Sequence, residues 1–178
     1  MMDTAVAERP KTSKLATVRV ADVRDTFGML DTLTIALSQS ETGYPAPDMP
    51  YAAQAMMDLI AQGLVFVAVD SADKVVGCLA LDSARWPWTA PNNPEGWHLY
   101  NQHFWVEPAY RGAGIARALL ALAKGRAESW VVRPDYIGVP LVIDVSMLDG
   151  DTGLKERFVK MCGFEYIGAK LLRRRRSS

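Results

Sequence analysis

Apolar positions in the first third of the chain recur at helical spacing. Thr17–Val20 alternates weakly and predicts a short strand. Asp22 is a suitable N-cap for a helix whose periodic positions are Val23, Phe27, Leu30, Thr34 and Leu37. Gly43, Pro45 and Pro47 then predict a loop. A second helix is expected from about Pro50 to a stop at Gly63, with Ala52, Met56, Leu59 and Ile60 facing inward.

The middle of the chain is typical of β-structure. Leu64–Val69 and Val75–Leu81 flank a polar turn at 70–74, which predicts an antiparallel hairpin. Ser83–Gly96, with its prolines and asparagines, is interpreted as a long surface loop. Trp97–Val106 is rich in aromatic residues and ends at Glu107-Pro108, which predicts another strand.

The last third alternates helix and strand patterns. An Ala/Leu-rich helix runs to about Trp130, Leu141–Val145 is a buried strand, Thr152–Cys162 is a helix stopped by Gly163, and Phe164–Arg173 is a final strand region. The order β-α-α-β-β-β-α-β-α-β predicts one α+β domain with a mixed sheet. We place this domain at residues 16–173, between a polar arm at 1–15 and a basic tail at 174–178.

Composition narrows the class of protein. The 178 residues are 49% hydrophobic and have zero net charge, which suits one globular domain and argues against a protein that coats nucleic acid. The zero is a sum of unlike parts: +2 over residues 1–24, −7 over 25–84 and +5 over 85–178. No signal-peptide or membrane-spanning run is seen, so a cytoplasmic protein is expected. Cys78 and Cys162 are expected to be reduced packing residues, with no metal site.

The segment from Val106 to Ala116 carries the clearest chemistry. A strand ends, two glycines follow at Gly112 and Gly114, and a helix begins at once. Glycines let the backbone approach a ligand closely, and the first helical N–H groups have no partner within the helix. Together with Arg111, this arrangement predicts a phosphate site. The nucleoside-triphosphate loop motif is absent, and the dinucleotide motif fails because Arg117 stands where its last glycine is needed.

This segment resembles the pyrophosphate loop of the GNAT superfamily of N-acetyltransferases, which use acetyl-coenzyme A. The family's Arg/Gln-x-x-Gly-x-Gly/Ala signature is matched by Arg111, Gly114 and Ala116, and its preceding Val-x-Pro-x-Tyr-Arg-Gly by residues 106–112. A later helix-Gly-Phe element is matched at Arg157–Phe164. The resemblance covers about residues 16–173 and implies a V-shaped splay between the fourth and fifth strands. The cofactor-binding residues that it implies are Phe104, Trp105, Val106, Arg111, Gly112, Ala113, Gly114, Ile115 and Ala116.

The resemblance also implies direct transfer of acetyl from acetyl-CoA to a primary amine, without a metal. In the family a general base often lies on the fourth strand, on the face shared with Phe104. Counting back from Phe104 in twos gives Gln102, Tyr100 and His98, whereas His103 has the wrong parity unless a bulge re-aims it. The base candidates are therefore His98, Tyr100, His103 and, on the facing strand, Asp144. The family's general-acid tyrosine is replaced by Val159, so Ser146, Tyr166 or water takes that role, or coenzyme A leaves as the thiolate.

The acceptor side is less clearly indicated. The acidic segment, with Asp25, Asp31, Glu41, Asp48 and Asp58, suggests a cationic acceptor such as a protein lysine, an N-terminus or a small amine, although solvated helix faces are the simpler explanation. Four aromatic residues, Trp86, Trp88, Tyr100 and Trp105, either wall the acceptor pocket or cover a core or subunit interface. No nucleic-acid or membrane partner is expected, except nucleic acid through Arg173–Arg176. The alternative function is a weak or inactive GNAT-fold component of a homodimer or larger assembly.

Overall fold

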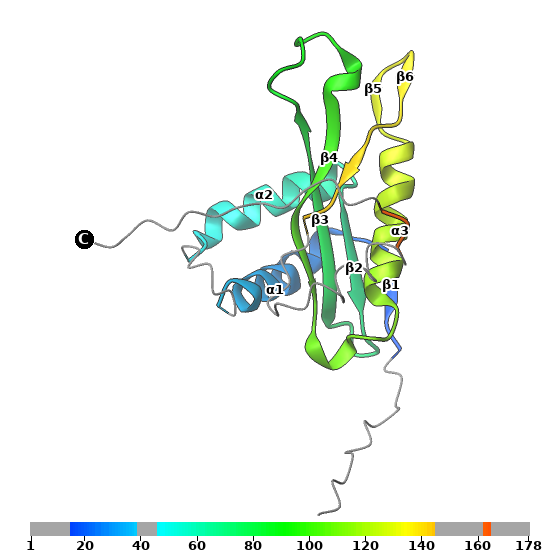
Figure 1. The fold of residues 1–178 in the computed structure, drawn as a ribbon. Coiled ribbons are helices and arrows are strands. Elements are labelled where there is room, and N and C mark those ends of the chain that lie inside the picture. The colour runs from blue at the N-terminus through cyan, green and yellow to red at the C-terminus, as the bar shows by residue number, and fades with distance from the viewer. Residues whose placement is uncertain (1–14, 39–45, 145–161, 165–178) are drawn as a thin grey trace, which may run out of the picture.

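The computed structural model describes residues 15–38, 46–144 and 162–164, which form a five-stranded sheet, a small hairpin and helices on both sheet faces (Figure 1). The elements in chain order are β1 (Thr17–Val20), the 3-10 helix η1 (Val23–Asp25), α1 (Thr26–Ser38), α2 (Met49–Ala61), β2 (Val65–Val69), β3 (Val75–Arg85), η2 (Pro94–Gly96), β4 (Trp97–Val106), η3 (Pro108–Tyr110), α3 (Ile115–Glu128), β5 (Val131–Arg133), β6 (Tyr136–Ile137) and β7 (Leu141–Val142).

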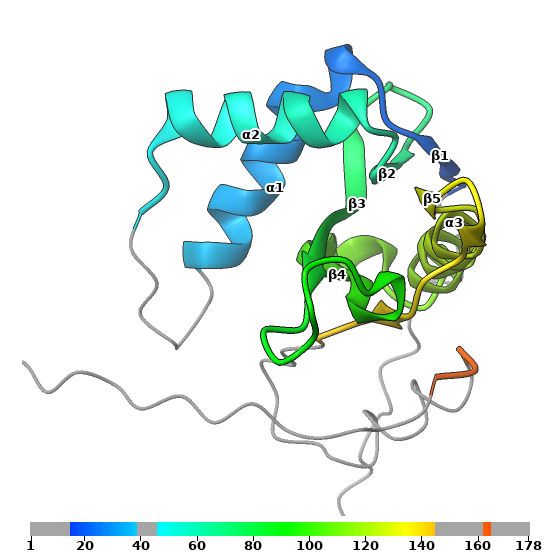
Figure 2. The same cartoon turned by 90° about the horizontal axis from the view of Figure 1, so that it is seen from above.

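The central sheet is mixed, as predicted. Its strand order is β1-β2-β3-β4-β7, and every neighbouring pair is antiparallel except β4 with β7, which is parallel. Helix α3 lies on one face, and α1 and α2 lie on the other (Figure 2). The α+β class predicted from the sequence is therefore confirmed.

Each face of the sheet has its own core. The α3 face is packed with leucines from the strands and from α3, among them Leu64, Leu79, Leu81, Leu99, Leu119 and Leu120. On the opposite face, valine, alanine and cysteine side chains of the strands pack against Met29 of α1 and Met56 of α2, among them Val65, Val67, Cys78 and Ala80. Cys78 and Cys162 are both free and buried, as expected.

The first helix is present, but the predicted apolar face was partly wrong. Val23 and Phe27 are 63% and 78% exposed, whereas Met29, Leu30 and Thr32 are buried. The chain first makes the 3-10 turn η1, capped by Asp22, before α1 begins. Since a 3-10 turn has about three residues rather than 3.6, the periodicity that runs through Val23 starts in the wrong phase for α1.

The loop predicted at Ser83–Gly96 is shorter than expected. β3 continues to Arg85, which is paired with Trp97, and η2 occupies the end of the loop. Ser83, Ala84 and Arg85 have little intrinsic strand preference, so their conformation is imposed by the partner strand. The β3–β4 hairpin consequently projects past α1 and α2 (Figure 1).

Towards the C-terminus, one hairpin was not predicted, and the last two predicted elements lie almost entirely outside the described residues. The sequence did not predict the β5–β6 hairpin, whose strands are three and two residues long. Earlier in the chain, α2 ends as predicted just before Gly63, which has a φ of 67°. The helix expected at Thr152–Cys162 and the strand expected at Phe164–Arg173 lie outside the described residues, apart from 162–164.

Candidate active site

The loop between β4 and α3 is an open backbone cradle. Gly112 and Gly114 have φ of 87° and 82°, a conformation that favours glycine, and a Cβ at either position would meet no atom within 4 Å. The helix proper starts with the bond from Ala118 N to Gly114 O. Gly114, as N-cap, provides no side-chain acceptor for the first helical N–H groups. These N–H groups and the positive end of the helix dipole therefore point to an open space suited to an anion.

Polar contacts fix the cradle to the sheet. The Tyr110 hydroxyl donates to Asp70 Oδ2 at 2.9 Å, which ties η3 to the β2–β3 turn. The Arg111 Nε donates to Val106 O at 3.1 Å, and the Arg111 side chain is exposed. Since one N–H of the guanidinium is used to orient it, its remaining donors can reach a ligand at the cradle.

Beyond the cradle, β4 meets β7 near the other end of the strand. Among the described residues, the β4–β7 ladder pairs Leu99 with Leu141 and Tyr100 with Val142. The Asn101 carboxamide then continues the contact, because it donates to Asp144 O at 3.0 Å and accepts from Asp144 N at 2.6 Å. The described strand pairs of positions 103–106 of β4 are with β3. The splay was expected along this part of β4.

A β-bulge overturns the face assignment obtained by counting in twos. Ala80 pairs with His103 and Leu81 pairs with Asn101, so Gln102 is an extra residue in β4. Phe104 packs with the α3-side core, whereas His103 is paired with Ala80 of the opposite core. Beyond the bulge, Tyr100 and His98 share that opposite face. The sequence count, which placed them with Phe104, was therefore wrong.

His103 is buried in the core beneath α1. Its Nε2 lies 3.1 Å from the Thr32 hydroxyl, which also donates to Met29 O and lies 3.1 Å from Cys78 Sγ. Burial lowers the pKa of His103 to about 4. The imidazole is therefore neutral near pH 7 and bonded to its neighbours in the core.

His98 belongs to an aromatic stack at the projecting end of the hairpin. Trp88 stacks on Trp86 with ring centroids 5.2 Å apart, and Trp86 stacks on His98 at 4.0 Å. His98 in turn lies 5.9 Å from the Tyr100 ring. Burial lowers the pKa of His98. Three of the four predicted aromatic residues are thus brought together, and Trp105 is separate from them.

A carboxylate that the sequence interpretation missed lies next to Tyr100. Asp82 of β3 is paired with Tyr100, and its Oδ2 lies 3.4 Å from the Tyr100 hydroxyl and 3.1 Å from Gln102 Nε2. The available signal was a break in the hydrophobic run, since Asp82 directly follows the buried stretch from Val75 to Leu81. A single charged residue at the end of such a stretch does not reveal its partners.

The predicted acidic residues of the helices have varied roles. Asp25 forms a bidentate ion pair with Arg19, at 2.7 and 2.9 Å, and Asp48 caps α2 through Tyr51 N. Asp58 accepts a bond from Gln54. Asp31 is exposed, and Glu41 lies outside the described residues. The helices therefore do not present these carboxylates as one cluster.

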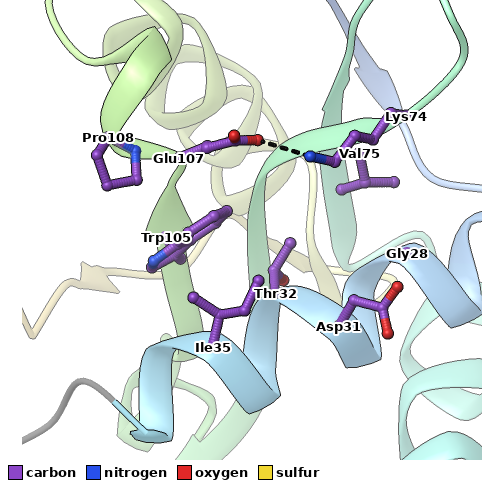
Figure 3. Close-up of a pocket in the computed structure, with 9 residues that line it drawn as sticks. All are labelled: Gly28, Asp31, Thr32, Ile35, Lys74, Val75, Trp105, Glu107 and Pro108. Carbon is purple, nitrogen blue, oxygen red and sulfur yellow. Dashed lines mark hydrogen bonds and ion pairs between the residues drawn. The ribbon is translucent and has the colours of Figure 1, made fainter.

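Asp31 lines a hollow of about 240 Å³ between α1 and the end of the sheet where β3 begins and β4 ends (Figure 3). Trp105 of β4 and Ile35 of α1 form its apolar wall. At its rim, Lys74 and Glu107 form an ion pair of 3.2 Å. Since this pair neutralises the lysine that lines the hollow, the hollow is mildly acidic through Asp31.

The remaining candidates are not described by the structure. Ser146, Tyr166 and Val159 lie outside the described residues, and Asp144 ends the described part of the β7 region. Within the described residues, no group of three or more His, Cys, Asp or Glu side chains is placed to hold a metal ion. The helices in this part of the chain are also too short or too polar to span a membrane.

Comparison with known proteins was made for the sequence and for the fold. A family model described as an acetyltransferase (GNAT) domain matches residues 61–166. No match was found among curated proteins. Among solved structures, the fold is similar to a predicted acetyltransferase from Clostridium acetobutylicum crystallised with acetyl-CoA, with a TM-score of 0.64, 19% identity, and coverage of 90% of this chain and 96% of that chain.

Two further solved structures share the fold at low sequence identity. An aminoglycoside 6'-N-acetyltransferase from Acinetobacter baumannii has a TM-score of 0.61 at 14% identity, with 92% of this chain and 99% of that chain covered. The glucosamine-6-phosphate N-acetyltransferase from Arabidopsis thaliana has a TM-score of 0.62 at 12% identity, with 90% and 98% covered. At such identities the likeness concerns the fold, and the acceptors of those enzymes differ from each other.

Proposed function

Because this chain belongs to the GNAT acetyltransferase family, we propose that it transfers the acetyl group of acetyl-CoA directly to a primary amine. Acetyl-CoA supplies an activated thioester, and the protein's contribution is to hold and orient the two reactants. Since both cysteines are free, we place the reaction in a reducing compartment, the cytoplasm. The single observation that carries the proposal is the open Gly112–Gly114 cradle between the end of β4 and the start of α3.

The cradle fits the pyrophosphate of coenzyme A. Two phosphates require several N–H donors and close approach of the backbone, which the glycines and the first turn of α3 provide. Arg111 is exposed beside the loop and adds a permanent positive charge. We therefore assign the phosphate contacts to residues 111–116, with Arg111 as the ion-pairing side chain.

The extended arm of the same molecule is proposed to lie along β4, between Asn101 and Val106. From Val106 to Asn101 a strand covers about 17 Å at about 3.3 Å per residue, so a ligand anchored at the cradle must be long and thin to reach the bulge. Backbone groups near Phe104, Trp105 and Val106 are proposed to bond this arm. One N–H there is proposed to face the thioester oxygen, where donors aligned with developing negative charge lower the barrier by a few kcal/mol.

The proton of the acceptor amine needs a route out of the site. His103 is bonded to Thr32 in the core and has a pKa near 4, and His98 is buried beneath Trp86, so their surroundings favour structural roles for both. Tyr100 is different, since its hydroxyl is in contact with Asp82 and Gln102 at the half-buried surface of the sheet. We propose that Tyr100, with water, forms the proton route, and that Asp144 stays a second candidate.

The alternative is a GNAT-fold protein that acts as a structural component. It is favoured by Val159, which stands where the family's proton-donating tyrosine is expected and has no proton to give. The two functions differ in whether acetyl-CoA is bound and consumed. Calorimetric titration with acetyl-CoA, combined with detection of free thiol in the presence of an amine panel, separates them.

Gly114→Trp tests the proposed function most directly. An indole at this position occupies the cradle, and the positive φ of 82° strains any side chain by about 1–2 kcal/mol. We expect acetyl-CoA affinity to fall by at least about 100-fold, the equivalent of one or two lost charge-assisted bonds. Titration calorimetry measures this loss, and thermal unfolding verifies that the variant is folded.

Gly125→Ala is the matched control, because Gly125 is an exposed residue within α3 at which an added Cβ would meet no atom within 4 Å. This change is expected to leave acetyl-CoA affinity unaltered and to stabilise the helix by about 0.5–1 kcal/mol. Equal acetyl-CoA binding by Gly114→Trp and the wild type would refute the assignment of the pyrophosphate contacts to the cradle. Absence of binding by the wild type would favour the structural alternative.

A further inference from the structure

Asp82 faces the same side of the sheet as α1 and α2. Ala80, two residues earlier in β3, packs in the core beneath these helices, and alternation places Asp82 on that face. Its cross-strand partner is Tyr100, next to the bulge at Gln102. The bulge therefore brings three polar side chains onto one face at the point where the β4–β7 ladder ends.

These three side chains form a small hydrogen-bonded site. Gln102 Nε2 donates to the Tyr100 hydroxyl at 2.7 Å and to Asp82 Oδ2 at 3.1 Å, and the Tyr100 hydroxyl donates to Oδ2 at 3.4 Å. The other carboxylate oxygen, Oδ1, accepts from Ser83 N at 2.7 Å. The carboxylate is thus fixed in orientation by three neutral donors, two of which approach the same oxygen.

The charge of this carboxylate is not compensated within the described part of the chain. No Lys, Arg or His nitrogen of a described residue lies within 4 Å of Asp82, in contrast to Asp25, which is paired with Arg19. The nearest imidazole in the stack, His98, has a pKa lowered by burial. A half-buried carboxylate that is oriented but lacks a cation is suited to bind one from outside the protein.

The distance between Asp82 and the proposed position of the thioester indicates which cation Asp82 binds. Asp82 lies three residues from Leu79, the partner of Phe104, so about 10 Å separates it from the β4 backbone proposed to face the thioester. That span is too long for Asp82 to take a proton directly from the amine that attacks the thioester. A second ammonium group, about 10 Å along the same acceptor, would reach it.

We propose that Asp82 is a specificity-determining residue that binds a second positive charge of a linear, aliphatic diamine or polyamine acceptor. Tyr100 and Gln102 hold the carboxylate toward that charge. Trp86, stacked on His98, closes the site at the projecting end of the hairpin, and the His98 ring lies next to Tyr100 in a tilted arrangement. This inference rests on the proposed acetyl transfer and names the class of acceptor for the same site.

Asp82→Asn is the decisive variant, since asparagine keeps the size of the side chain and an acceptor for Ser83 N but removes the charge. Rates with 1,8-diaminooctane and spermidine are compared with the rate for n-octylamine, which has a single charge. In the wild type we expect kcat/KM for the dications to exceed that for octylamine by about 10–100-fold, as for a charged hydrogen bond. In Asp82→Asn this ratio is expected to fall to about one, mainly through KM.

Asp135→Asn is the matched control for charge. Asp135 is 73% exposed on the β5–β6 hairpin, where it pairs with Arg133, and the change also removes one negative charge. It is expected to leave the dication-to-monoamine ratio at the wild-type value. Thermal unfolding and acetyl-CoA titration of both variants verify that the fold and the cradle are intact.

A direct binding measurement separates this inference from the proposed function. Spermidine is titrated calorimetrically into protein saturated with coenzyme A, where no transfer occurs. About 10–100-fold weaker binding by Asp82→Asn supports the inference even if turnover is absent. Equal spermidine binding by both proteins, no spermidine binding by the wild type, or a wild-type ratio near one overturns it. If the wild type transfers acetyl to none of the amines, that result counts against the proposed function instead.

Discussion

On the α3 face of the sheet, the fully buried side chains of the described residues are apolar, whereas the other face also buries polar side chains. The buried polar residues of the described chain belong to η1, to α1 or to the face toward them: Asp25, Thr26, Thr32, His98 and His103. On the α3 side, the candidate chemistry lies outside the core, in the backbone of the glycine loop.

This difference indicates two ways of building a binding surface. The proposed pyrophosphate contacts use N–H groups that any helix start offers, so the α3 face needs only a rigid apolar core and two glycines. The proposed acceptor contacts use side chains, which must be held by hydrogen bonds among themselves, as Asp82 is by Tyr100 and Gln102. The three changes below test this contrast, from the largest expected effect to the smallest.

Leu120→Ala removes a fully packed side chain from the α3 face, where Leu120 is 1% exposed. We expect the free energy of unfolding to fall by about 2–5 kcal/mol, independent of pH, because the loss is one of apolar contact and of cavity formation. Urea unfolding measures it. Leu15→Ala, at a residue that is 85% exposed, is the control and should change stability by less than about 0.5 kcal/mol. A loss below about 1 kcal/mol for Leu120→Ala would contradict the rigid-core interpretation.

His103 should make the stability of the other face depend on pH. Its folded-state pKa of about 4 is below the value of about 6.5 in an unfolded chain, so the unfolded chain binds the proton first on acidification. This contribution is therefore present above pH 6.5 and is lost as the pH falls from 6.5 to about 4, by up to about 3 kcal/mol.

His103→Gln keeps a polar side chain near Thr32 but does not titrate in this range. Urea unfolding of both proteins at several pH values between about 7 and about 4.5 measures the difference. We expect the stability curve of the variant to be flatter than that of the wild type over this interval. Parallel curves would show that His103 has the same proton affinity in the folded and unfolded chains.

Asn101→Ala acts where the two faces meet, at the end of the β4–β7 ladder. The change removes both carboxamide bonds to the Asp144 backbone, and we expect a loss of about 1–2 kcal/mol in the free energy of unfolding. Faster hydrogen exchange of the Asp144 amide is the local readout. Gln102→Ala is the control, since this neighbouring carboxamide contacts Asp82 and Tyr100 instead. Unchanged exchange at Asp144 would mean that other contacts hold the β7 region.

Much of the α3 side could be predicted from the sequence. The bounds of β4 were predicted correctly at Trp97–Val106. The helix after the glycines and the hairpin before β4 were also predicted, although β3 extends beyond the predicted end at Leu81. These features depend on local signals, such as a continuous apolar run, a pair of glycines or a proline after a strand. The positive φ angles at Gly112 and Gly114 agree with the interpretation of that loop as a close backbone approach.

The opposite face could not be predicted in the same way. One inserted residue, Gln102, reverses the direction of every side chain before it in β4, and no local pattern reveals that insertion. The phase of α1 depended similarly on a single 3-10 turn at η1. The sequence therefore named Tyr100 and His98 as candidates but assigned them to the wrong face, and it did not identify Asp82.

The amino-acid sequence by itself determined the fold class, the family and the place of the Gly112–Gly114 loop before α3, because periodicity and short motifs are encoded in consecutive residues. The tertiary structure alone decided which side chains meet beside the bulge. Contacts such as Asp82 with Tyr100 join residues 18 positions apart, and their existence depends on strand register. Register is a property of the paired strands rather than of either segment, so the proposed acceptor site became visible only once β3 and β4 were aligned.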